Sequence, residues 1–99
     1  MAIRLVALTS LNPGMQDKLD EYMNVVGKLM SAADAEIVER YELQADIVGD
    51  GEFQFVTIVD YPDQAAVDSV FKSAEYLALS DVKESAFSCY QIYTIAKQA

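Results

Sequence analysis

Arginine and tyrosine side chains, rather than histidine or cysteine, are the groups of this sequence that could bind or transform a small molecule. Histidine is absent from all 99 residues, and with it the commonest general base and metal ligand of proteins. Cys89 is the single cysteine, so it can form neither an internal disulfide nor a thiolate metal site, and we expect it to pack as a small apolar side chain. The sequence therefore predicts no metal site and no cofactor.

Arg40 is the first candidate for a ligand-binding residue. It stands among Glu36, Glu39 and Glu42, so a structural ion pair is the default expectation. Alternatively, its planar fork of N–H donors could bind a carboxylate or an enolate. The other candidates are aromatic, and packing is the default expectation for each of them, with the tyrosine hydroxyls near water; they are Tyr41, Phe55, Tyr61, Tyr76 and Tyr90.

The charge of the chain excludes several partners. Sixteen acidic residues stand against seven basic ones, giving a formal net charge of −9, whereas nucleic acids need a concentrated basic surface. Phe53 and Phe55 could imitate base-stacking rings, but they have no basic surroundings. An anionic membrane surface is disfavoured for the same reason, and no apolar run reaches the roughly 18 residues of a membrane span. With no signal-peptide pattern at residues 1–5, we expect a cytoplasmic protein.

Periodicity divides the chain into alternating strand and helix signals. Alternating apolar residues at 3–9 predict a strand, and Asn12-Pro13 resembles the N-cap and first position of a helix whose apolar stripe runs from Met15 to Met30. Gly49-Asp50-Gly51 predicts a tight hairpin between two strands. The other expected elements are strands at 35–48, 52–60 and 87–96, a helix from Pro62, and a short helix from Ser73.

This order predicts a single domain, residues 1–99, of the α+β class. A β-α-β-β-α-β chain with right-handed crossovers gives the ferredoxin-like arrangement, a four-stranded antiparallel sheet with both helices on one face. The strands at 3–9 and 52–60 would then lie at the centre. The charged strand at 35–48 suits an edge, where charges discourage stray pairing.

The helix-free face of such a sheet should be polar if it faces water, yet both faces of the central strands are apolar. We assign Val6, Leu8, Val56 and Ile58 to the helix-covered face. The open face would then be too apolar for solvent and would bind a second copy of the chain in a twofold homodimer; its residues would be Ile3, Leu5, Ala7, Phe53, Phe55 and Val59.

The segments Tyr61-Pro62-Asp63-Gln64-Ala65-Ala66 and Phe71 to Leu79, with Ser73-Ala74-Glu75-Tyr76, resemble a family of small bacterial proteins. This family is a branch of the dimeric α/β-barrel superfamily whose domain has no known function. The resemblance implies a dimer formed sheet against sheet. The chain differs from the family pattern in having Asp34-Ala35 where paired glycines are common before the second strand, and in lacking tryptophan.

Three functions remain open from the sequence. The favoured one is binding of a small organic ligand in a mostly apolar cavity between sheet and helices. The superfamily resemblance implies an alternative, a cofactor-independent oxygenase or isomerase acting on an aromatic or polyketide-like compound. A non-catalytic dimerisation or ligand-sensing module is the third. Whether the protein is an enzyme stays undecided at this level.

Overall fold

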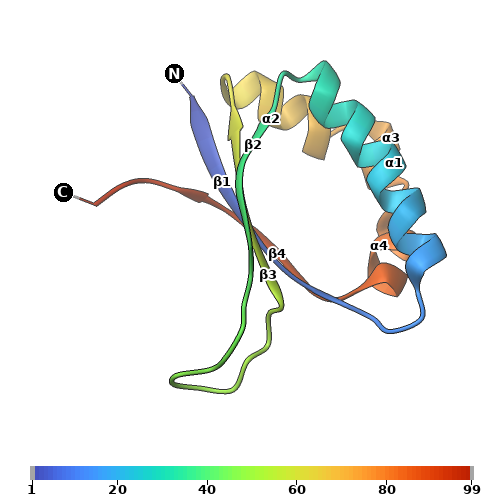
Figure 1. The fold of residues 1–99 in the computed structure, drawn as a ribbon. Coiled ribbons are helices and arrows are strands. Elements are labelled where there is room, and N and C mark those ends of the chain that lie inside the picture. The colour runs from blue at the N-terminus through green and yellow to red at the C-terminus, as the bar shows by residue number, and fades with distance from the viewer. Residues whose placement is uncertain (1, 99) are drawn as a thin grey trace.

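A computed structural model describes residues 2–98 as one antiparallel sheet with all the helices on one side of it (Figure 1). The predicted strand–helix–strand–strand–helix–strand order is confirmed, although the second helical region is divided into three short helices. In chain order the elements are β1 (Ile3–Leu11), α1 (Gln16–Ala32), β2 (Glu36–Glu42), β3 (Phe55–Tyr61), α2 (Gln64–Phe71), α3 (Ala74–Leu77), α4 (Ser80–Ala86) and β4 (Phe87–Ile95).

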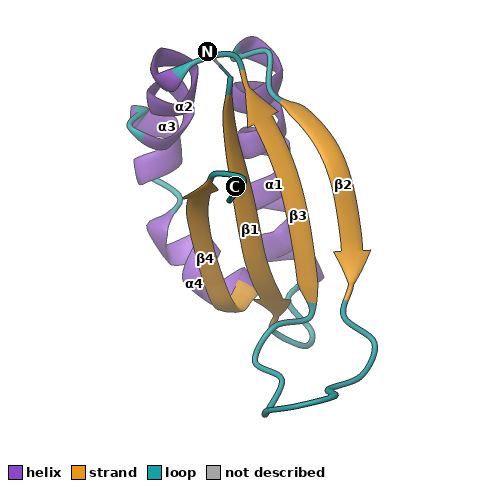
Figure 2. Cartoon of the chain, turned by 90° about the vertical axis from the view of Figure 1, so that its left-hand side faces the viewer, coloured by secondary structure: helices purple, strands orange, loops and turns teal. Residues whose placement is uncertain are grey.

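The strands lie in the order β2-β3-β1-β4 (Figure 2). The two predicted central strands, β1 and β3, pair antiparallel with Val6 opposite Ile58. The charged strand β2 lies at one edge, as its composition predicts. This order is the one expected of a ferredoxin-like sheet, and it leaves the face opposite the helices uncovered in the monomer.

The start of α1 differs from the prediction. Asn12 is not the N-cap, because the helix begins at Gln16 and its cap, Met15, makes no side-chain hydrogen bond. The side chain of Asn12 instead donates to the carbonyl of Ser85, 3.0 Å away, and its backbone N–H donates to Ala86 at 2.9 Å. A tertiary contact with the end of α4 has therefore replaced the local capping that the sequence indicates.

The other helix starts are set by local capping. The second helix begins two residues later than expected, because Asp63 caps α2 by accepting from the Ala66 N–H at 2.8 Å. Ser73 caps α3 in the same way, accepting from Tyr76. Side-chain oxygens of this kind satisfy N–H groups that have no partner inside the helix.

The predicted tight hairpin at Gly49-Asp50-Gly51 is wrong. Strand pairing ends after Leu43, whose N–H donates to Gln54 at 2.8 Å, and residues 44–53 form a long loop that projects beyond the sheet (Figure 1). The Asp46 carboxylate accepts from the Gly51 N–H at 3.0 Å. This side-chain bond occupies a donor that a two-residue hairpin would have used in the strand ladder.

The assignment of the two sheet faces is also wrong, and they are interchanged. Leu5 and Val59 face the helices and are buried, with Tyr61 and Val70 in the same core cluster. Val6, Leu8, Val56 and Ile58 lie on the helix-free face, because paired residues share a face and successive residues alternate. In the central strands both the odd-numbered and the even-numbered positions are apolar, so the hydropathy pattern could not show which set faces the helices.

The core consists of two clusters on the helix side of the sheet. One cluster joins β1 and β3 to α2 and includes Leu5, Val59 and Val70. The other joins α1 to the α3–α4 region through Tyr22, Val26 and Leu79. Residues of both clusters border the cavity described next, so the packing of the core determines its walls.

Candidate functional site

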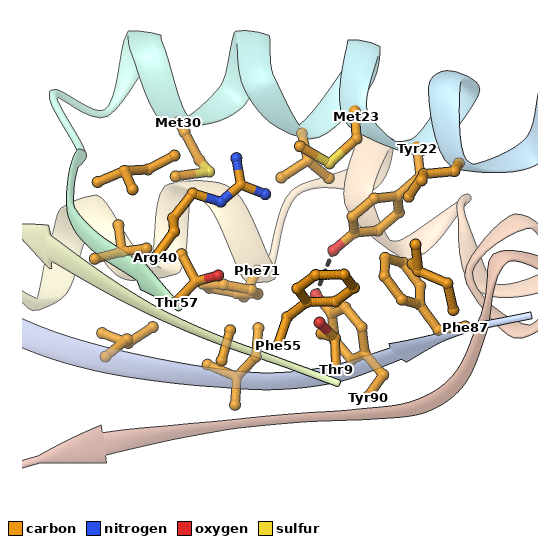
Figure 3. A pocket seen from close by; sticks show the side chains of 18 of the residues that line it. Thr9, Tyr22, Met23, Met30, Arg40, Phe55, Thr57, Phe71, Phe87 and Tyr90 are labelled. Atoms are coloured by element: carbon orange, nitrogen blue, oxygen red, sulfur yellow. Dashed lines mark hydrogen bonds between the residues drawn. The ribbon is translucent and has the colours of Figure 1, made fainter. Parts of the chain in front are cut away.

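A cavity of about 250 Å³ lies between the inner face of the sheet and helix α1 (Figure 3). Alternate residues of the strands form its floor, and one face of α1 forms its roof. The walls are largely aliphatic and aromatic, with a few polar groups. The lining residues are Leu5, Ala7, Thr9, Leu11, Leu19, Tyr22, Met23, Val26, Met30, Ile37, Arg40, Phe55, Thr57, Val59, Tyr61, Phe71, Phe87, Tyr90 and Ile92.

The mouth of the cavity lies between α1 and β2. Of the lining residues, the exposed ones are Met23 on α1, with 43% of its surface accessible, and Ile37 and Arg40 on β2. At the opposite edge of the sheet, Tyr90 and Ile92 of β4 are partly buried. A ligand from solvent would therefore enter past Arg40.

The guanidinium of Arg40 extends over the cavity beneath α1, near Met30 (Figure 3). Arg40 lies opposite Thr57 in the β2–β3 pairing, so both side chains face the helices. Within residues 2–98 it forms no ion pair, which means that the expected pairing with Glu36, Glu39 or Glu42 is not found. Its five N–H donors are thus free to bind an anion.

Three tyrosine hydroxyls meet at the inner end of the cavity. The hydroxyl of Tyr90 on β4 shares a hydrogen bond with Tyr22 of α1 (Figure 3). It shares a second one with Tyr76 of α3 at 3.0 Å. Lys83 of α4 holds its ammonium group 5.0 Å from the centre of the Tyr90 ring and 5.4 Å from that of Tyr76. These contacts fix the tyrosine cluster, meaning Tyr22, Tyr76 and Tyr90, against three helices.

Burial raises the pKa of three hydroxyls in the cavity wall further above neutral pH. It raises the pKa of Tyr22 and of Tyr90 above their ordinary value, and the proximity of the two phenols raises that of Tyr90 further. Burial also raises the pKa of Tyr61 to about 12. All three phenols are therefore neutral near pH 7 and can donate hydrogen bonds, but they are not poised to remove protons.

The structure brings together four of the six predicted ligand-binding residues. Arg40, Phe55, Tyr61 and Tyr90 line the cavity. Tyr41 does not, because it pairs with Val56 on the helix-free face and keeps 53% of its surface exposed.

Tyr76, the sixth predicted residue, lies behind the cavity wall. It touches Tyr90 through its hydroxyl and borders a separate surface hollow beside Lys83. The prediction missed Tyr22, Thr9 and Thr57. Tyr22 was detectable as part of the apolar stripe of α1, whereas the two threonines would have required the correct choice of sheet face.

Residues 2–98 offer neither a cluster of metal ligands nor a membrane-spanning helix. They contain no group of three or more cysteine, aspartate or glutamate side chains placed to hold a metal ion. No helix in this part of the chain combines the length and apolar character needed to cross a bilayer.

Comparison with known proteins gives a family and a fold. Residues 6–96 match the family described as Domain of unknown function (DUF1330). No curated protein matches the chain. A solved protein of unknown function from Rhodopseudomonas palustris superposes with a TM-score of 0.81 at 16% identity, covering 99% of this chain and 83% of that one.

Two further structures share the fold. A dabb family protein with a ferredoxin-like fold from Mesorhizobium loti has a TM-score of 0.64 at 14% identity, covering 99% of this chain and 98% of its own. A dimeric ferredoxin-like protein of unknown function from Thermobifida fusca has a TM-score of 0.57 at 16% identity, with 98% and 92% covered. At these identities the likeness shows the ferredoxin-like fold alone.

Proposed function

The chain belongs to the DUF1330 family, whose domain has no assigned function, and from its own cavity we propose that it binds a small organic molecule between sheet and helix α1. The observation that carries this proposal is the combination of an apolar cavity with a guanidinium at its mouth that forms no ion pair among residues 2–98. Ligand sites typically pair apolar walls with a few convergent polar groups.

The volume of the cavity sets the size of the ligand. A dry apolar cavity of roughly 150 Å³ accommodates benzene. By that ratio a space of about 250 Å³ accepts a ring with several further atoms, or ~10 non-hydrogen atoms in all. The ligand would therefore be a monocyclic aromatic compound or an aliphatic compound of similar size.

The lining residues favour binding over acid–base catalysis. Besides Arg40, the polar side chains of the cavity wall belong to tyrosines and threonines, with no carboxylate among them. Burial keeps the phenols protonated near neutral pH. An oxygenase or isomerase that must first remove a proton from its substrate would lack a suitable base in this wall.

We further infer that the protein is a homodimer joined through the helix-free sheet face. Val6, Leu8, Val56 and Ile58 form an apolar centre on that face, between the exposed ion pair Arg4–Asp60 and Gln91. From strand spacing and rise, the face offers roughly 600–800 Å², the contribution of one partner to a standard interface. The dimeric state of the ferredoxin-like protein from Thermobifida fusca supports this inference.

A cytoplasmic location fits the free Cys89, because thiols persist in reducing compartments.

Thermal unfolding with and without candidate ligands tests the binding proposal. A compound at about ten times its Kd stabilises the folded state by ~1.4 kcal/mol, which for a domain of this size raises Tm by roughly 6–11 °C. We expect such a rise with monocyclic aromatic compounds, and none in the variant Ala7→Phe, whose new ring fills the cavity floor.

The matched control is Ala65→Phe, which adds the same ring to an exposed position of α2 and should keep the response. The absence of stabilisation by any compound in a broad panel, or an equal response in Ala7→Phe, would contradict the proposal.

A further inference from the structure

Counting protons in the tyrosine cluster reveals a donor without a partner. Three phenols carry three O–H donors, but within residues 2–98 their hydroxyls share only two hydrogen bonds, both made by Tyr90. One O–H is therefore left over whichever way the bonds point. Rotation about a phenolic C–O bond transfers this spare donor from one hydroxyl to another without moving a ring.

The spare donor can be presented to the cavity. Tyr22 and Tyr90 line the cavity, whereas Tyr76 lies behind Tyr90. When Tyr76 donates to Tyr90, the unused O–H belongs to Tyr90 or Tyr22, whose side chains both line the cavity (Figure 3). An acceptor atom on a ligand would select this arrangement, and the ammonium group of Lys83 beside the rings makes the same end electropositive.

The second polar end of the cavity is Arg40, with the hydroxyl-bearing Thr57 opposite it on β3. Arg40 and Tyr90 stand on the two edge strands, β2 and β4. Three strand spacings of ~4.8 Å separate the backbones of these strands, about 14 Å in all, and the two side chains extend from them toward each other over apolar walls. The guanidinium at the mouth is a cation that only donates, whereas the neutral hydroxyls at the inner end can donate or accept, and one of their O–H groups is unused.

We propose that the ligand of this cavity is an elongated carboxylate whose apolar, ring-sized body carries a hydrogen-bond acceptor, such as a carbonyl oxygen, at its far end. The carboxylate binds Arg40, and the far oxygen accepts the spare O–H of the tyrosine cluster. This inference depends on the proposed function, because it names the class of compound that the cavity would bind.

Four probes of equal size separate the two ends. They are 4-acetylbenzoate, 4-isopropylbenzoate and the two corresponding carboxamides, with affinities measured by isothermal titration calorimetry. We expect each benzoate to bind 10–100-fold more tightly than its amide, since a charge-assisted pair is lost. We expect 4-acetylbenzoate to bind about tenfold more tightly than 4-isopropylbenzoate, which lacks the acceptor.

Variants test which residue is responsible for the preference for carboxylate over amide and which for the preference for acetyl over isopropyl. Arg40→Met should reduce the preference for carboxylate over amide to less than threefold and leave the preference for acetyl unchanged. Tyr22→Phe should retain the acetyl preference, because two hydroxyls sharing one bond still leave one spare O–H. The double variant Tyr22→Phe/Tyr90→Phe should lose it. This sequence of effects follows from the proton count and would not arise if the rings merely filled space.

Three results would overturn the inference. They are equal affinities for all four probes in the native protein, a carboxylate preference that survives Arg40→Met, and binding of none of the four. If the double variant does not fold, the native protein provides the test: equal affinities for 4-acetylbenzoate and 4-isopropylbenzoate would contradict the hydrogen bond from the tyrosine cluster. If none of the four probes binds but neutral apolar compounds such as toluene and naphthalene still raise Tm, and do so less in Ala7→Phe, the proposed function stands and only this inference fails, so the two failures are distinguishable.

Discussion

The phenolic oxygens of Tyr76 and Tyr90 lie 3.0 Å apart, so that a residue of α3 is bonded to the edge strand β4 through the buried end of the cavity. Tyr90 also bonds to Tyr22 of α1. A single hydroxyl thus links two helices to the sheet, and its removal leaves two other buried hydroxyls without a partner.

Replacement of Tyr90 by Phe should destabilise the protein more than replacement of Tyr76 by Phe. The first change breaks both hydrogen bonds of the cluster and the second breaks one, and each unsatisfied buried group costs about 1–3 kcal/mol. Urea unfolding monitored by circular dichroism measures both. Equal losses would contradict a central role for Tyr90.

The folded state should lose stability at alkaline pH. Burial raises the pKa of Tyr61 to about 12 from its ordinary value of 10.0. A group whose pKa is higher in the folded state favours folding fully below pH 10, and this contribution disappears as the pH rises toward 12. The free energy of unfolding should fall over this interval, and less steeply in Tyr61→Phe. Parallel pH profiles for the two proteins would show that Tyr61 is not responsible.

Acid should weaken the ion pair between Arg4 and Asp60 on the sheet surface. Arg4 donates to both carboxylate oxygens of Asp60, at 2.7 and 2.8 Å, and these bonds lower the pKa of Asp60 below its ordinary 3.8. A lowered carboxyl pKa favours folding above the ordinary value, and this contribution is lost as the pH falls through the lowered one. Asp60→Asn should therefore be slightly less stable than the native protein at pH 7, because the pair is exposed. The difference should begin to shrink as the pH falls past 3.8 and vanish below the lowered pKa of Asp60.

Substitution of Ile58 by Glu should dissociate the proposed dimer. Ile58 lies opposite Val6 at the centre of the helix-free face, where a buried, unpaired carboxylate would be costly. Light scattering after gel filtration should give twice the mass of the chain for the native protein and the single mass for the variant. Ala65→Glu, which places the same charge at an exposed position of α2, is the control that should remain dimeric. A monomeric native protein at micromolar concentration would refute the interface.

Replacement of Asp34 by glycine should stabilise the folded protein. It follows α1 in a left-handed conformation, with φ of 57°, where glycine is the preferred residue at a helix end. We expect Asp34→Gly to raise the free energy of unfolding by up to about 1 kcal/mol, because the left-handed conformation is costly for residues other than glycine, and Asp34→Ala to lower it. Thermal unfolding of the two variants checks the sign, and stabilisation by alanine would contradict the conformational explanation.

Several elements of the fold were predictable because their signals are local and repeated. Alternation over residues 3–9 and the three-to-four spacing from Met15 to Met30 each constrain many residues at once, so both elements were found with their correct type. Their ends were less predictable, because single contacts determine them. Asn12 bonds to Ser85 instead of capping α1, and Asp46 bonds to Gly51 instead of permitting a tight hairpin.

The candidate site was partly predictable. Arg40 was identifiable as a basic residue in an otherwise acidic strand and Tyr90 as an amphipathic aromatic residue, and both line the cavity. The strand register separates Tyr41 from the site by turning it to the other face, opposite Val56. Alternation alone places the adjacent residues Arg40 and Tyr41 on opposite faces. Because β2 contains an irregularity between Ile37 and Glu39, counting from the start of the strand could not show which of the two faces the helices.

The sequence by itself determined the order of the elements, the central position of β1 and β3 and the absence of histidine chemistry, because periodicity and composition are properties of the chain alone. Only the tertiary structure decided which sheet face meets the helices. Leu5 and Val6 are both apolar, and burying either parity gives a similar hydrophobic gain. What differs is how side chains fit beneath α1, where Ala7 and Thr57 leave room for the cavity. Such complementarity depends on residues distant in the chain and exists only once they are packed together.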